Sequence, residues 1–152
     1  ELGLVGGSED GSCDHGIRCT DPDDAKVFAE KTGIDALAVA IGNAHGNYPA
    51  ALKLAFDVLE QIHNKVDIPL VLHGGSGLPP ETVQAAITIP GGGVSKINIA
   101  TDLEQAFLGT LGCQRKTNRE IWQMDEKALA EAAEAVQRVV VDKITNFLLG
   151  KG

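Results

Sequence analysis

The chain is short of positive charge and of long apolar runs, and each shortage excludes a class of protein. Lys and Arg number 13 against 21 Asp and Glu, which gives a formal net charge of −8. Nucleic-acid binding needs a basic surface, so we expect no nucleic-acid partner. No apolar run approaches the ~20 residues that span a bilayer, so we also expect no membrane association.

Cysteine is scarce as well. The three cysteines are Cys13, Cys19 and Cys113, and no two of them have Cys-x-x-Cys spacing. An odd number without such spacing favours free thiols in a reducing compartment. The first residues also lack the basic segment that opens a secretory signal. We therefore expect a cytoplasmic protein.

Apolar residues and glycine are plentiful by contrast. Hydrophobic residues make up 43% of the chain and charged residues 22%, values typical of a folded globular protein. The 18 glycines cluster just after apolar runs, which favours functional loops over a flexible linker.

The apolar runs predict buried strands. Residues 36–41 form a continuous run of small apolar side chains, which is typical of a parallel strand covered on both faces. Further strands are predicted over residues 68–72 and 94–99, and a fourth could end at Glu1.

Helical patterns separate these strands. The first helix is predicted to start at Thr20, as its cap, and to end at Gly33. Apolar residues recur at helical spacing in four later segments. These segments are residues 50–62, 79–87, 101–111 and 126–149.

Alternating strands and helices predict an α/β fold with a parallel sheet and right-handed crossovers. A doubly wound sheet and a (β/α)8 TIM barrel both fit this pattern. A complete barrel needs about 250 residues, so some four βα units would supply half of one.

Two histidines follow consecutive strands. His45 lies just past the strand over residues 36–41, and His73 ends the next one. Neighbouring parallel strands end on the same rim, where α/β proteins bind ligands. Imidazole is a favoured Zn²⁺ ligand, so the pair suggests a metal site. The alternative is that each is an ordinary hydrogen-bonded rim histidine. His15 and His63 lack this placement.

Glycine-rich and helix-capping loops on the same rim suggest an anion site. Residues 74–77 read Gly-Gly-Ser-Gly, and residues 98–101 run directly into a helix start. Backbone N–H groups in such loops bind phosphate. The alternative for the first loop is a plain tight turn.

Charged residues near the rim leave more than one interpretation open. Glu1 and Glu9 could carry protons or bind metal, although solvated loop acids are commoner. Lys96 could form a Schiff base or an ion pair, and the paired histidines favour the ion pair because they point to a metal.

The same residues resemble the class II aldolase family. Residues 1–10 are similar to its signature E-L-G-x-x-G-G-x-E-D, and residues 32–46, 70–79 and 96–101 are similar to its later motifs. The likeness runs in order from residue 1 to about residue 107. It implies that residues 1–152 are the C-terminal half of one aldolase barrel domain.

The resemblance also implies roles. His45 and His73 would be zinc ligands, and Glu1 would ligate a displaced metal. Glu9 would take part in proton transfer, and Asn98 would steady the enediolate. The residues implied to bind dihydroxyacetone phosphate are Gly46, Gly74, Gly75, Ser76, Asn98, Ile99, Ala100 and Thr101.

The implied reaction is reversible cleavage of fructose 1,6-bisphosphate, with Zn²⁺ as the Lewis acid. Tagatose 1,6-bisphosphate is the alternative substrate, and a non-catalytic phosphate-binding half-barrel is a further alternative. The family's H-x-D-H motif, with its third zinc histidine and catalytic aspartate, is missing from residues 1–152. We therefore expect this stretch alone to lack full activity. The family implies a homo-oligomer, a dimer or a tetramer. Residues 112–123 are less similar to the family, and Trp122 and the basic residues in this stretch are candidate subunit contacts.

Overall fold

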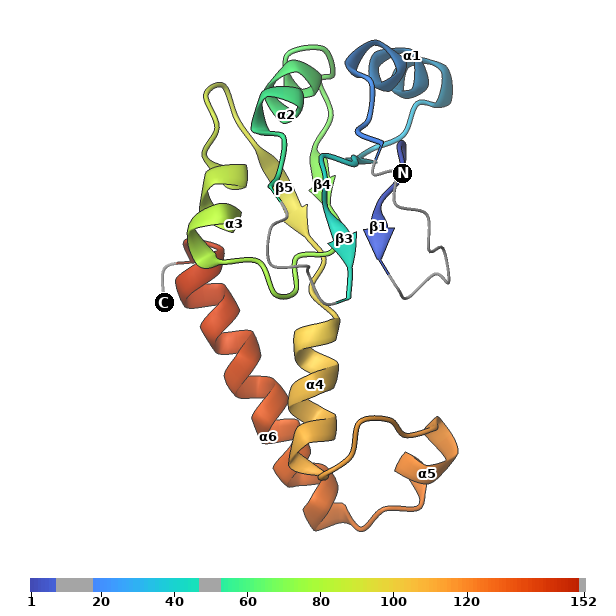
Figure 1. Cartoon of the computed structure of the whole chain (residues 1–152), viewed down its shortest axis with the longest axis vertical. Coiled ribbons are helices and arrows are strands. Elements are labelled where there is room, and N and C mark those ends of the chain that lie inside the picture. The colour runs from blue at the N-terminus through green and yellow to red at the C-terminus, as the bar shows by residue number, and fades with distance from the viewer. Residues whose placement is uncertain (8–17, 47–52, 151–152) are drawn as a thin grey trace. The chain divides into compact units, whose positions relative to one another are not determined.

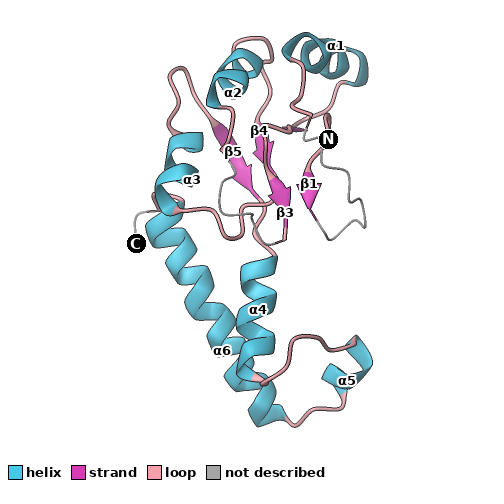
Figure 2. Ribbon diagram, in the orientation of Figure 1, coloured by secondary structure: helices cyan, strands magenta, loops and turns pink. Residues whose placement is uncertain are grey.

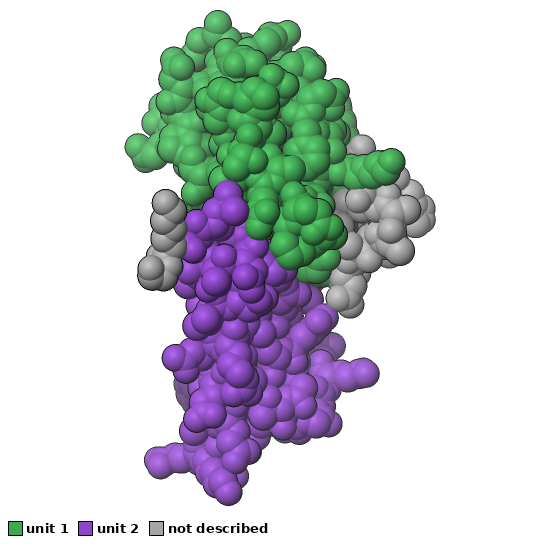
Figure 3. All heavy atoms as spheres, turned by 90° about the vertical axis from the view of Figure 1, so that its left-hand side faces the viewer, with its two compact units in different colours: residues 1–99 green, residues 100–152 purple. Residues whose placement is uncertain are grey.

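The structure is a computed structural model that describes residues 1–7, 18–46 and 53–150. The chain divides into two compact units, Glu1–Ile99 and Ala100–Gly152, which Figure 3 shows in different colours. That residues 1–152 form half of one barrel domain stays a prediction.

The first unit contains two groups of parallel strands. β1 (Gly6–Gly7) pairs with β3 (Ala44–His45), and β4 lies between β2 and β5 in the other group. The bounds of these three strands are Leu37–Ala38 for β2, Leu70–Leu72 for β4 and Val94–Ile97 for β5. Every ladder between these strands is parallel, which confirms the predicted α/β architecture.

The core of this unit is built from the predicted apolar runs. Leu37, Val39, Ile41 and Leu72 are fully buried, and Leu70 is almost fully buried. Because strands covered on both faces have no polar face, their sequence is continuously apolar. Burying such side chains is the main favourable term in folding the unit.

Helices accompany the strands of this unit, as Figures 1 and 2 show. They are α1 (Pro22–Thr32), α2 (Phe56–His63) and α3 (Pro80–Ile87). α1 and α2 contact each other, and α3 contacts β5. α1 ends as predicted, with Gly33 in the left-handed conformation at φ 63°.

The predicted cap of α1 was wrong by one residue. Asp21 is the N-cap, and its carboxylate accepts hydrogen bonds from the N–H groups of Asp23 and Asp24 at 2.8 and 3.1 Å. Thr20 is instead buried between two strand segments, where its hydroxyl donates to the Leu2 carbonyl and accepts from the Ala40 N–H. The need to satisfy these buried backbone groups decides the role of Thr20.

The Asp21 cap makes the stability of α1 depend on pH. The two N–H donors lower the pKa of the Asp21 carboxyl from 3.8. A carboxyl whose pKa is depressed on folding adds stability above its unfolded pKa, and that stability is lost as pH falls through the folded pKa. We expect Asp21→Asn to flatten this acid-side loss because an amide accepts the same bonds without titrating. Unfolding midpoints of both proteins, measured by circular dichroism from neutral pH down to pH 2, check this. Parallel curves for the two proteins would contradict it.

The predicted start of α2 was also wrong. The helix was expected over residues 50–62, but it begins at Phe56, and Lys53 to Ala55 are not helical. Residues 50–52 lie outside the described residues. The Ala55 N–H donates to the Ile41 carbonyl at 2.8 Å, so it bonds the segment between β2 and β3 rather than a helical turn.

The strand predictions need correction. Within residues 36–41, β2 covers only Leu37–Ala38 and Val39 forms an isolated bridge, whereas His45 lies in a separate strand, β3. Pairing continues beyond Glu1, because Leu2 bridges to Val39 and β1 follows at Gly6. β5 ends at Ile97 rather than at residue 99. The ladder between β4 and β5 shifts register after Leu70, so that Val71 pairs with Lys96.

The second unit is helical. It contains α4 (Thr101–Thr110), α5 (Asn118–Trp122) and α6 (Glu126–Asp142), and α6 continues into a π-helical turn, η1 (Lys143–Phe147). α4 and α6 pack side by side (Figure 1). Asp102 of α4 and Lys143 form an ion pair of 2.6 Å, with both side chains largely buried.

In the part of the chain that is described, no helix has the length and apolar character needed to cross a membrane.

Candidate active site at the strand ends

The two predicted histidines lie close together. His45 closes β3, and His73 follows β4 directly. Their ring centroids are 5.8 Å apart, with 34° between the ring planes. The carboxyl ends of parallel strands therefore bring two imidazoles from distant parts of the sequence into one place.

Glu1 joins this pair through His73. Its Oε1 lies 2.9 Å from His73 Nδ1, and the two side chains are 39% and 23% exposed. A carboxylate beside an imidazole nitrogen fixes the orientation of the ring, and it leaves the other nitrogen, Nε2, to act as a ligand or a base. In this arrangement Glu1 orients His73.

A third residue, Asn43, is central to the geometry but was given no role from the sequence. It is fully buried, and its carboxamide bonds the Ile41 N–H at 2.8 Å and the His73 carbonyl at 3.0 Å. A buried polar group normally has such partners. The available signal was a carboxamide inside a buried stretch, two residues before His45.

The glycine-rich loop after His73 is tightly packed. Gly74 and Gly77 adopt positive φ angles of 66° and 73°, which glycine tolerates best, and Ser76 is buried. A Cβ on Gly75 would lie 2.5 Å from Ile97 Cγ2. The Gly75 N–H already donates to the Asn98 carbonyl at 2.8 Å, so this glycine serves close packing more directly than anion binding.

Asn98 is held at the end of β5 on both sides. Its N–H donates to the Leu72 carbonyl at 2.9 Å, and its side-chain Oδ1 accepts from Lys96 Nζ. Lys96 therefore bonds a neutral carboxamide, and the ion pair expected for it stays a prediction. With Oδ1 bonded to Lys96, the amide nitrogen is the donor end of the Asn98 side chain.

The structure describes most, but not all, of the remaining predicted site residues. Glu9 lies outside the described residues. Gly46 follows His45 with a φ of 84°. Ile99 ends the first unit, whereas Ala100 and Thr101 belong to the second, where Thr101 opens α4 and Ala100 is its N-cap position.

The donors present fit part of a metal site. A catalytic zinc has three protein ligands and an open position. The described residues contain no group of three or more His, Cys, Asp or Glu side chains that could hold a metal. Two adjacent imidazoles agree with two of the expected ligands, and a complete site requires one more from outside the described residues.

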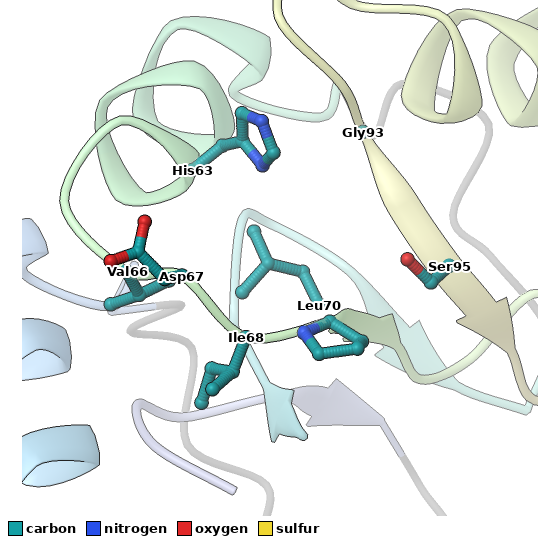
Figure 4. Close-up of a pocket in the computed structure, with 8 residues that line it drawn as sticks. His63, Val66, Asp67, Ile68, Leu70, Gly93 and Ser95 are labelled. Atoms are coloured by element: carbon teal, nitrogen blue, oxygen red, sulfur yellow. The ribbon is translucent and has the colours of Figure 1, made fainter. Parts of the chain in front are cut away.

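A pocket of about 350 Å³ lies near the other ends of the strands (Figure 4). His63, Asp67, Leu70 and Ser95 are among the residues that line it. The His63 Nε2 atom lies 2.7 Å from the Gly91 carbonyl oxygen, so this imidazole is bonded to the loop before β5. The placement of His63 agrees with its exclusion from the candidate site.

The fold and the site define a parallel α/β protein with two neighbouring histidines at strand carboxyl ends. The family model described as "Fructose-bisphosphate aldolase class-II" matches residues 1–150. The chain belongs to this class II fructose-bisphosphate aldolase family, whose fold is TIM-barrel-like.

Similar proteins agree with this assignment. A fructose-bisphosphate aldolase of Staphylococcus aureus is 40% identical over 147 residues, which cover 97% of this chain and 50% of that protein. One from Geobacillus stearothermophilus is 38% identical over 153 residues, with the same coverage. The crystal structure of the YdjI aldolase from Escherichia coli K12 aligns with a TM-score of 0.66 and 36% identity, over 84% of this chain and 44% of that one. The chain thus spans about half the length of the relatives it matches.

Proposed function

We propose that the protein carrying this chain cleaves fructose 1,6-bisphosphate reversibly to dihydroxyacetone phosphate and glyceraldehyde 3-phosphate. The observation that supports this most directly is the His45–His73 pair, with ring centroids 5.8 Å apart, in a chain of the class II aldolase family. Both residues match the family's metal-binding motifs. We further propose that the chain forms the C-terminal half of a barrel.

His45 and His73 would hold Zn²⁺ together with a histidine outside this chain. The bound ion would supply Lewis-acid chemistry at the ketone oxygen as the C3–C4 bond breaks. Glu1 would keep the His73 ring in its ligating orientation through the 2.9 Å contact at Nδ1, and it could itself ligate a displaced metal.

Asn98 would stabilise the enediolate by donating from its amide nitrogen to the developing negative charge. The bond from Lys96 to Asn98 Oδ1 supports this role, because it fixes which end of the carboxamide donates. The proposed phosphate loops are Gly46, Gly74 to Ser76, and Asn98 to Thr101. Within these loops, Gly75 would allow close packing because it has no side chain.

Two acids would transfer protons in this scheme. Glu9 is proposed as a proton carrier from its match to the family signature alone. The catalytic aspartate of the family motif H-x-D-H would come from outside this chain.

Cleavage assays on the complete protein test the proposal. We expect cleavage of fructose 1,6-bisphosphate, loss of that activity after chelation, and recovery on adding Zn²⁺. Dihydroxyacetone phosphate released by each sugar, measured by a coupled NADH assay, gives the two kcat/KM values. Equal values for fructose and tagatose 1,6-bisphosphate would remove the preference for fructose. Absence of cleavage of either sugar by the zinc-loaded protein would favour a non-catalytic phosphate-binding protein.

Assembly as a homo-oligomer and a cytoplasmic location stay predictions. The second unit exposes several large apolar side chains, and Trp122 is 86% exposed. Such side chains are more common at protein interfaces than on free surfaces. Light scattering on the purified protein would give the number of subunits.

A further inference from the structure

We propose that Asn43 is a positioning residue that sets the separation of His45 and His73. The proposal rests on the proposed metal-binding role of the two histidines. It assigns Asn43 a task that none of the predicted ligands performs, which is to connect the backbones that carry them.

The strand pairing explains why such a connection is needed. His45 belongs to β3, which pairs with β1, whereas His73 follows β4, which pairs with β2 and β5. A bridge between Leu2 and Val39 joins the two groups, but among the described strands no ladder pairs β3 with β4, the strands next to the two imidazoles. The Asn43 Nδ2 atom donates to the carbonyl of His73 itself, at 3.0 Å, and so crosses from one group to the other.

Asn43 is also anchored on its own side. Its Oδ1 accepts from the Ile41 N–H at 2.8 Å, and its backbone carbonyl accepts from the Gly6 N–H of β1 at 3.1 Å. Turning the side chain would break both of its hydrogen bonds. Because the side chain has no exposed surface, water could not replace them. Three backbone segments thus meet on one residue, two positions before His45.

Gly42 makes this arrangement possible. Its φ of 94° turns the chain, so that the Asn43 side chain can reach back to the Ile41 N–H. A Cβ on Gly42 would lie 3.0 Å from the Lys53 carbonyl oxygen, so the close approach also favours glycine. Asn43 is therefore held in one orientation by its neighbours.

The consequence for function follows from the sensitivity of metal sites to ligand placement. Groups behind the ligands typically change metal affinity by 10–100-fold when they are removed. Asn43→Leu places a side chain of similar size in the buried site but removes both side-chain hydrogen bonds. We expect Zn²⁺ affinity to fall by about 10–100-fold in this variant.

Thr20→Val is the matched control. Thr20 is another buried polar residue whose side chain joins two strand segments, at Leu2 and Ala40, and it contacts neither histidine in the described hydrogen bonds. Its removal should destabilise the fold in a similar way but leave Zn²⁺ affinity within about threefold, since the ligands keep their positions.

The experiment measures three quantities on the complete protein: Zn²⁺ affinity by competition with a chelating dye, stability in urea, and the imidazole NMR signals of His45 and His73 in the metal-free state. We expect Asn43→Leu to change affinity and both imidazole signals, and Thr20→Val to change stability alone. If both variants lose affinity in proportion to stability, or if Asn43→Leu leaves the imidazole signals in place, the proposal is overturned. Should Asn43→Leu not fold, Asn43→Ser replaces it, because a hydroxyl is too short to make both bonds.

The two proposals fail in distinguishable ways. A wild-type protein that binds no Zn²⁺ would contradict the proposed function. The metal-free imidazole signals would still report whether Asn43 positions the histidines.

Discussion

Substituting His73 with alanine is expected to abolish metal-dependent cleavage, with kcat/KM falling by about 10³-fold or more. A bound metal contributes several kcal/mol to transition-state stabilisation, and each 1.36 kcal/mol corresponds to about a factor of ten in rate. His73 is also the histidine whose ring Glu1 contacts, so the substitution removes a proposed ligand and leaves Glu1 without this partner, whereas the bond from Asn43 to the backbone carbonyl of residue 73 can remain. Zn²⁺ titration and steady-state kinetics on the complete protein check both parts.

His63→Ala provides the control for that experiment. His63 ends α2 and lies 2.7 Å from the Gly91 carbonyl, near the pocket of Figure 4. We expect its loss to cost about 1 kcal/mol of stability, the net contribution of a typical hydrogen bond, and to leave kcat/KM within about twofold. Equal losses of activity in the two variants would contradict a metal role for His73, because they would point to a general effect of removing an imidazole.

Substituting Leu72 with alanine is expected to lower the free energy of unfolding by about 2–5 kcal/mol. Leu72 is fully buried in β4, the strand between β2 and β5. Removing its side chain loses transfer free energy and leaves a cavity, because a core strand cannot move inward freely. Urea unfolding followed by circular dichroism measures the change.

Leu4→Ala makes the same chemical change at a site that is 42% exposed. We expect it to cost less than about 1 kcal/mol, because surface substitutions are usually nearly neutral. If the two variants were equally destabilised, burial in β4 would not explain the effect at Leu72. The slope of the unfolding curve should stay unchanged in both proteins, since neither substitution alters the surface exposed on unfolding by much.

The strands were predictable because burial on both faces leaves a plain signature. The run from Leu37 to Ile41 contains no polar residue, and the structure buries all of it. The position of His45 and His73 followed from the same logic, because parallel strands end on one rim. Predicting that the two histidines lie close together required only the order of the strands, whereas the roles proposed for them rest on the family motifs.

The errors came from contacts between distant segments. Thr20 has good capping chemistry, but the backbone groups of Leu2 and Ala40 recruit its hydroxyl. The residues before Phe56 favour helix, but Ala55 bonds Ile41 in the segment between β2 and β3 instead. Local propensity cannot reveal either partner, because each partner lies 14 or more residues away in the sequence.

Asn43 was missed for a related reason. Its significance depends on the direction of its side chain, which the backbone of Gly42 determines, and on a carbonyl 30 residues away. A sequence pattern locates strand ends well, but it does not show which polar side chain spans two of them. Such residues become visible only when buried hydrogen bonds are assigned one by one.

The pairing of β1 with β3 limits how the gene can change by insertion or deletion. Gly6 pairs with Ala44 and Gly7 with His45, and successive side chains in a strand point to opposite faces. One residue gained or lost between Asn43 and His45 would turn the imidazole to the other face of the strand. We therefore expect a change in length within the segment from Gly42 to His45 to disrupt the site, whereas substitutions there can leave the register unchanged.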